Sequence, residues 1–98
     1  MGQKRKILII GRHPEIMARV VNLLKANGYD AAGANQNEEA IDLFGAGNFD
    51  AVVIGGGVDA ESKSLFHKIF TAIHPAIKIL DAHPHSILSD LKAHLDQK

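Results

Sequence analysis

Alternating side chains that can ligate a metal lie near the carboxyl end of the chain, at Asp81, His83 and His85. Imidazole and carboxylate groups bind zinc or nickel, and alternate residues of an extended chain point the same way. His13 follows an apolar run and could lie at the same sheet edge. Pro84 favours a turn, however, and a turn would separate the alternating ligands. The favoured interpretation is no metal site, with these four ligands as the candidates if one exists.

Three consecutive glycines, Gly55 to Gly57, directly follow the apolar run Ala51 to Ile54. Glycine lets backbone N–H groups approach an anion closely, above all in front of a helix. Arg12 follows another apolar run and would be aimed at the same crevice. The spacing matches neither a P-loop nor the dinucleotide-binding glycine pattern, so a flexible strand-to-helix turn is the favoured interpretation. An anion site at Arg12 and Gly55 to Gly57 stays open as the alternative.

No group of side chains has the arrangement that nucleophilic or acid–base catalysis requires. The sequence contains no cysteine, which excludes thiol chemistry and disulfides. None of the serines at positions 62, 64, 86 and 89 lies in a nucleophile-elbow context. We therefore expect no enzymatic activity and no cofactor.

The elements that position these residues alternate between strand and helix. Short apolar runs predict four strands, at residues 7–10, 29–34, 50–54 and 76–80. Apolar residues at three- and four-residue spacing predict four helices: Pro14 to Asn27, Asn35 or Asn37 to Gly45, Asp59 to His74, and Pro84 or His85 nearly to Lys98. Asn35 or Asn37 is the expected N-cap of the second helix, and Asp59 that of the third. Repeated β-α units form a parallel sheet with helices on both faces. We expect residues 50–54 at its centre, buried on both sides, and residues 29–34 at an edge.

Five short segments occur in a characteristic order and spacing: Lys6–Ile10, His13–Ile16, Asn27–Tyr29, Asn37–Ile41 and Phe49–Ile54. Together they resemble the first half of a response-regulator receiver (CheY-like) domain, over residues 6 to 57. The resemblance implies a three-layer α/β fold of the flavodoxin and CheY-like type. Its parallel sheet would have about four strands in the order 2-1-3-4, with helices on both faces.

The resemblance also implies a phosphorylation site that this chain does not reproduce. The family's acidic pair falls on Gly11 and Arg12, its phosphoacceptor aspartate on Gly55, its hydroxyl residue on Asp81 and its lysine on His83. Glycine offers no carboxylate to form an acyl phosphate. A positive charge at Arg12 opposes the magnesium ion that the acidic pair would hold. We therefore expect a degenerate receiver-like domain that does not take up phosphate.

The chain is also short for a five-strand receiver, because one strand and one helix follow the helix that starts at Asp59. Either the fourth or the fifth strand-helix unit is absent, and with it part of the family's usual output surface. The strand Ile77 to Leu80 would then be an exposed edge, blunted by Lys78 alone. Exposed edges and apolar patches favour association. We predict a homodimer that buries this edge with part of the third or last helix.

The composition of the 98 residues is that of one globular domain spanning residues 1–98, with 46% hydrophobic residues and a formal net charge of zero. The one basic run, Lys4 to Lys6, is typical of a solvated terminus, so we expect no nucleic-acid partner. No apolar stretch is long enough to span a bilayer, and the lack of cysteine is compatible with a reducing cytoplasm. We expect a cytoplasmic protein-interaction module in signal transduction, with a small anionic-ligand or nucleotide sensor as the alternative.

Overall fold

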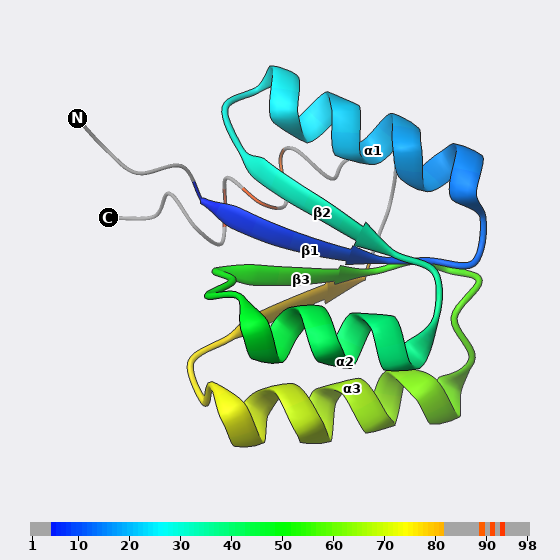
Figure 1. The fold of residues 1–98 in the computed structure, drawn as a ribbon, viewed down its shortest axis with the longest axis vertical. Helices are drawn as coiled ribbons and strands as arrows, with labels where there is room; N and C mark the ends of the chain where they lie inside the picture. The colour runs from blue at the N-terminus through cyan, green and yellow to red at the C-terminus, as the bar shows by residue number, and fades with distance from the viewer. Residues whose placement is uncertain (1–4, 82–88, 90, 92, 94–98) are drawn as a thin grey trace.

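The computed structural model describes residues 5–81, 89, 91 and 93. Within them, one parallel sheet has the strand order β2-β1-β3-β4. Its strands are β1 (Lys6–Ile10), β2 (Asp30–Ala34), β3 (Ala51–Ile54) and β4 (Lys78–Asp81). The helices are α1 (Pro14–Ala26), α2 (Asn37–Ala46) and α3 (Ala60–Ile73). Figure 1 shows α1 on one face of the sheet and α2 and α3 on the other, so the three-layer fold and the strand order predicted from the sequence are confirmed.

The two central strands carry the core on both of their faces. Leu8 pairs in register with Val52, and both belong to the cluster under α2 and α3. Ile9 pairs with Val53, and both belong to the cluster under α1. Because successive side chains of a strand point to opposite faces, a continuous apolar run fills two cores at once. The prediction of a central strand buried on both sides is confirmed.

The helices begin and end for local reasons. Pro14 occupies the first turn of α1, where its missing N–H costs nothing, and Gly28 follows the helix with φ of +90°. Asp59 caps α3 as expected, and its carboxylate accepts a hydrogen bond from the Ser62 N–H at 3.1 Å. On α3, Phe66 and Phe70 are fully buried against the sheet.

Two local predictions were wrong. The N-cap of α2 is Gln36, not Asn35 or Asn37, because the Asn37 side chain is used in a longer-range network described below. The last strand begins at Lys78, not Ala76, because the chain first turns: the Ile77 N–H donates to the His74 carbonyl at 3.0 Å.

Beyond β4, the chain returns to the face that carries α1. Ser89, Leu91 and Ala93 are helical, and Leu91 is fully buried in the cluster under α1. A right-handed crossover from β4 to a further parallel strand would instead place its helix beside α3. Within the described residues β4 is therefore an edge strand, and no helix lies beside α3 on the side away from α2. The predicted start of the last helix, at Pro84 or His85, lies outside the described residues.

None of the helices in the described part of the chain is both long and apolar enough to cross a membrane.

Candidate functional site

The loops that follow β1 and β3 meet at the carboxyl edge of the sheet. The Gly55 N–H donates to the Ile10 carbonyl at 2.6 Å, which joins the two strand ends. A Cβ atom at position 55 would lie 3.1 Å from the Ile10 oxygen and 3.4 Å from the Gly11 Cα. Glycine at this position lets the two loops approach one another where a side chain would crowd the Ile10 carbonyl.

Arg12 lies beside the glycine loop, as the sequence predicted, but its charged group points elsewhere. Its Cβ atom is 3.6 Å from where a Cβ of Gly57 would be. Its guanidinium reaches toward α2, where Nη1 donates to the Asn35 carbonyl at 2.7 Å and Nη2 to Asn37 Oδ1 at 2.5 Å. These contacts hold the half-buried arginine away from the glycine N–H groups.

The Arg12 contacts continue as a hydrogen-bonded chain toward α3. Asn37 Nδ2 donates to Ser62 Oγ at 3.0 Å, and Ser62 Oγ donates to Asp59 Oδ1 at 2.8 Å. Asp59 Oδ2 accepts from the Ser62 N–H, so both carboxylate oxygens are used. The hydrogen bonds from Ser62 lower the pKa of Asp59, and the positive charge of Arg12 adds to the effect. We call Arg12, Asn37, Ser62 and Asp59 the polar bridge, because they tie the loop after β1 to the first turns of α2 and α3.

Sequence reasoning missed the polar bridge. It treated Asn37 as a helix cap and Ser62 as a rejected nucleophile. One feature of the sequence could have indicated the contact. Both polar residues lie in the first turns of helices that are expected to pack on the same face of the sheet. Ser62 is buried, which a serine tolerates because its hydroxyl both donates and accepts here.

On the α1 side, the same two loops border a cavity of about 270 Å³, which we call the glycine pocket. Its walls are mostly apolar or lack side chains: Ile9, Ile10, Gly11, Arg12, His13, Ile16, Met17, Val20, Gly55, Gly56 and Gly57. The Met17 side chain forms part of the wall and packs where Gly11 and Gly33 have no Cβ. Its Sδ atom is 3.2 Å from the Cβ position of Gly11, and its Cε atom is 2.8 Å from that of Gly33.

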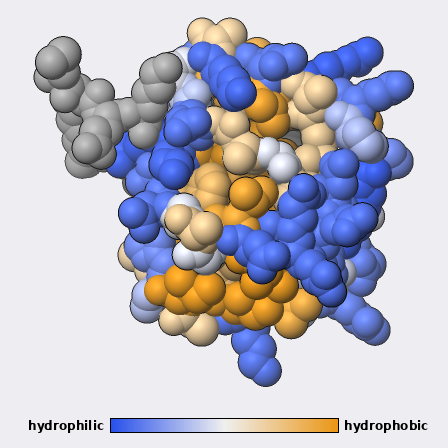
Figure 2. Space-filling view, in the orientation of Figure 1, coloured by the Kyte–Doolittle hydropathy of each residue, from blue (hydrophilic) through white to orange (hydrophobic). Residues whose placement is uncertain are grey.

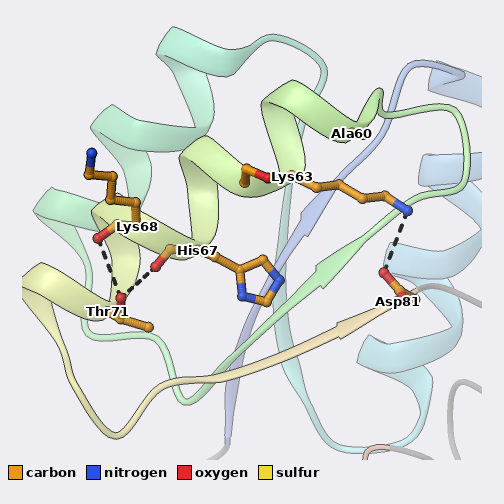
Figure 3. A pocket seen from close by; sticks show the side chains of 7 residues that line it. Ala60, Lys63, His67, Lys68, Thr71 and Asp81 are labelled. Carbon is orange, nitrogen blue, oxygen red and sulfur yellow. Dashed lines mark hydrogen bonds and ion pairs between the residues drawn. The ribbon is translucent and has the colours of Figure 1, made fainter.

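A second, more open groove of about 730 Å³ lies between α3 and β4. Figure 3 shows Lys63 reaching from α3 across this groove to Asp81, with Nζ and Oδ1 3.6 Å apart. The His67 ring projects from α3 into the same space. The groove is polar, since Ser64, Lys68 and Thr71 complete its lining on α3 together with Ala60.

The structure does not bring the candidate metal ligands His13 and Asp81 together. His13 borders the glycine pocket, whereas Asp81 borders the α3 groove and pairs with Lys63. Among the described residues, no three His, Cys, Asp or Glu side chains are grouped as a metal site requires. His83 and His85 lie outside the described residues, so their part of the prediction stays a prediction.

The residues at the carboxyl ends of β1 and β3 also do not fit a magnesium ion. Magnesium is bound by hard oxygen ligands, including at least one carboxylate. The described residues that line the glycine pocket include no carboxylate, and the Asp59 oxygens already accept hydrogen bonds from Ser62.

Comparison with known proteins supports the fold. No protein-family model matches the chain, and no curated protein matches it. Among solved structures, a response regulator receiver domain protein (CheY-like) from Methanospirillum hungatei matches with a TM-score of 0.71 and 20% identity, over 96% of this chain and 78% of that chain. The receiver domain of the hybrid histidine kinase CckA matches with a TM-score of 0.69 and 19% identity, over 92% and 98%. A response regulator from Burkholderia pseudomallei, solved with a phosphorylated aspartic acid and a calcium ion, matches with a TM-score of 0.69 and 20% identity, over 91% and 55%. The resemblance predicted from the sequence is confirmed as a receiver-like, CheY-like fold.

Proposed function

We propose that this chain, which has the fold of receiver domains, is a signalling domain that does not accept phosphate and acts by binding another protein. The observation that carries the proposal is the closed contact between Gly55 and the end of β1. An acyl phosphate needs a carboxylate at the reacting position, and Gly55 has none. Arg12, at the carboxyl end of β1, is held in a hydrogen-bonded bridge with Asn35 and Asn37. We expect neither phosphorylation nor any other enzymatic turnover.

Incubation with magnesium and acetyl phosphate, followed by intact mass measurement, tests the negative half of this proposal. We expect the mass to stay unchanged, whereas a receiver domain with an aspartate at the reacting position, treated in parallel, should gain about 80 Da. A stable adduct of that mass on this chain would contradict the proposal.

The surface around α3 and β4 supports the protein-binding half. Figure 2 shows an apolar patch in the lower part of the view, over α2 and α3. On α3, the apolar side chains of Leu65 and Ile73 are 41% and 54% exposed. The strand β4 lies on the other flank of α3. Within the described residues it pairs with β3 alone, and its Ile79 and Leu80 side chains are only half-buried. Exposed apolar side chains and free strand edges are each typical of association surfaces.

The partner that we propose first is a second copy of the chain, joined at the β4 edge around a two-fold axis. Such an interface should bury about 1,200 Å² or more in total. Light scattering should give twice the mass of the chain at micromolar concentration. Leu80→Lys should shift the chain to a monomer because it places a charge in the interface, whereas Arg19→Glu, on α1, should not. A monomer mass that persists over a tenfold rise in concentration would exclude the homodimer and leave a different protein as the partner. We expect this association in the cytoplasm, without nucleic acid.

The alternative function, a sensor of an anionic ligand or nucleotide held by Arg12 and Gly55 to Gly57, has less support. The guanidinium is already bound to Asn35 and Asn37, so an anion would have to break both hydrogen bonds. A thermal-shift panel of nucleotides and sugar phosphates distinguishes the two functions. A stabilising compound whose effect is lost in Arg12→Ala would favour the sensor.

A further inference from the structure

The glycine pocket has the size and lining of a small-molecule site. Its volume of about 270 Å³ is just below the usual range of ligand cavities and suits a ligand of few atoms. Its walls come from Ile16, Met17 and Val20 on α1 and from the ends of β1 and β3. Two of these apolar side chains are buried, but Ile16 is 49% exposed at the mouth of the pocket. An apolar body of a few carbon atoms would cover this surface, which is otherwise in contact with water.

The glycine loop supplies hydrogen-bond donors at the same pocket. Among the described residues, no acceptor is found for the N–H groups of Gly56 and Gly57, whereas the neighbouring N–H groups of Gly55 and Val58 are bonded to carbonyls. The His13 ring lies against the loop, with Nε2 3.4 Å from the position that a Cβ of Gly57 would take. Two free backbone donors and one imidazole are therefore gathered at one end of an apolar cavity.

The charge of the lining selects the kind of group that these donors would bind. Arg12 and His13 border the pocket, and no acidic side chain does among the residues that the structure describes. A carboxylate can accept hydrogen bonds from adjacent backbone N–H groups and from an imidazole, and such charge-assisted bonds are stronger than neutral ones. The polar bridge turns the Arg12 guanidinium away, so the head group would rest on the glycine N–H groups and His13.

We propose that the glycine pocket binds a small monocarboxylic acid, with its carboxylate on Gly56, Gly57 and His13 and its apolar body against Ile16, Met17 and Val20. This site differs from the anion site that the sequence suggested, because it requires an apolar body and does not use the guanidinium of Arg12. It also goes beyond the proposed signalling function, and it can be present whether or not the chain forms a dimer.

Amide NMR of the full ¹⁵N-labelled chain, titrated with hexanoate, tests the proposal directly. We expect saturable shifts of the Gly56 and Gly57 amides with a dissociation constant of about 1 mM, as befits a ligand with so few atoms. Acetate, which lacks the apolar body, and hexanol, which lacks the carboxylate, should each bind at least about tenfold more weakly. No saturable shift with hexanoate would overturn the proposal, and equal binding of hexanol would overturn the assignment of a carboxylate.

Matched variants test the residues. Ile16→Ser should weaken hexanoate binding about fivefold by removing apolar contact, while Ile73→Ser, at a similarly exposed position on α3, should leave it unchanged. His13→Ala should weaken binding about tenfold, while His67→Ala, which alters the α3 groove, should not. All four side chains are exposed, so their removal should preserve the fold, and the unperturbed amide spectrum verifies this. If each control variant lost as much affinity as its partner, the ligand would be bound elsewhere and the proposal would be wrong.

Discussion

The crevice at the carboxyl end of the sheet has one side of paired polar side chains and one side of glycines and apolar side chains. Toward α2 and α3, the polar bridge pairs Arg12, Asn37, Ser62 and Asp59 with one another. Toward α1, glycines and apolar side chains leave the glycine pocket open, with backbone donors at its rim. The loop after β1 borders both sides of the crevice. Its Arg12 contributes the guanidinium to the polar bridge and also lines the glycine pocket.

The difference shows how two kinds of residue shape one end of a receiver-like fold. A charged side chain must find acceptors, and Arg12 finds them at the start of α2. A glycine has no side chain that needs a partner, and Gly55 lets the loops approach one another. The polar side should therefore respond to substitution through lost hydrogen bonds, and the apolar side through changes in packing.

The largest effect that we expect is on the apolar side. Met17→Ala should lower the free energy of unfolding by about 2 to 3 kcal/mol, because the buried Met17 side chain fills the space above Gly11 and Gly33. Urea unfolding measures the loss. Leu23→Ala, at an exposed position of the same helix, should cost less than about 1 kcal/mol. If both variants lost the same free energy of unfolding, the packing of Met17 on Gly11 and Gly33 would not stabilise the fold.

The contact between the loops gives the next largest effect. Gly55→Ala should cost about 1 to 2 kcal/mol, because its Cβ would lie 3.1 Å from the Ile10 carbonyl oxygen. Gly56→Ala meets no atom within 4 Å and has no positive φ, so it should be neutral or stabilise by about 0.5 kcal/mol. Thermal and urea unfolding of this pair of variants compares two adjacent glycines. A neutral Gly55→Ala would show that the loops can separate, and that glycine at this position is not required for their contact.

The sequence was sufficient for the elements and their order. Apolar runs such as Ile7 to Ile10 and Val52 to Ile54 predict strands from local composition, and crossover handedness makes the repeated units a parallel sheet. The order of the strands came from the resemblance to receiver domains, and the structure has that order. The Asp59 cap was predictable because its partner Ser62 lies three residues away.

The site was harder to predict, because its contacts join distant residues. Arg12 and Asn37 are 25 residues apart, and nothing local to either residue tells that the guanidinium turns toward α2 instead of toward Gly55 to Gly57. The pocket depends on how Met17 packs on Gly11 and Gly33, which are separated by 22 residues of sequence. Local competition explains the other errors: Asn37 is drawn into the polar bridge and so does not cap α2.

On the polar side, we expect moderate and non-additive losses. Ser62→Ala and Asn37→Ala should each lower the free energy of unfolding by about 1 kcal/mol, since each removes hydrogen bonds of a partly buried network. The double variant should lose about 0.5 kcal/mol less than the sum, because the two side chains share one hydrogen bond. A double-mutant cycle by urea unfolding measures this coupling. Strict additivity would show that the Asn37–Ser62 contact does not contribute to stability in solution.

The smallest effect concerns the acidic end of the polar bridge and its dependence on pH. Hydrogen bonds from Ser62 lower the pKa of Asp59 from its ordinary value of 3.8, so the folded state favours the ionised carboxylate. A group with a lowered folded-state pKa contributes stability above its unfolded pKa and loses it as pH falls through the folded value. The contribution should therefore be fully present at pH 6 and decline below about pH 4, and it should be small because the carboxylate is exposed to solvent.

Urea midpoints at pH 6 and pH 3 should differ more for the unaltered chain than for Asp59→Asn, which caps α3 without titrating. Glu61→Gln, in the same turn of α3 but outside the bridge, serves as the control for removing an acidic charge. If Asp59→Asn and the unaltered chain lost stability in parallel between these pH values, the carboxylate would not be held ionised by Ser62, and the bridge would end at Ser62.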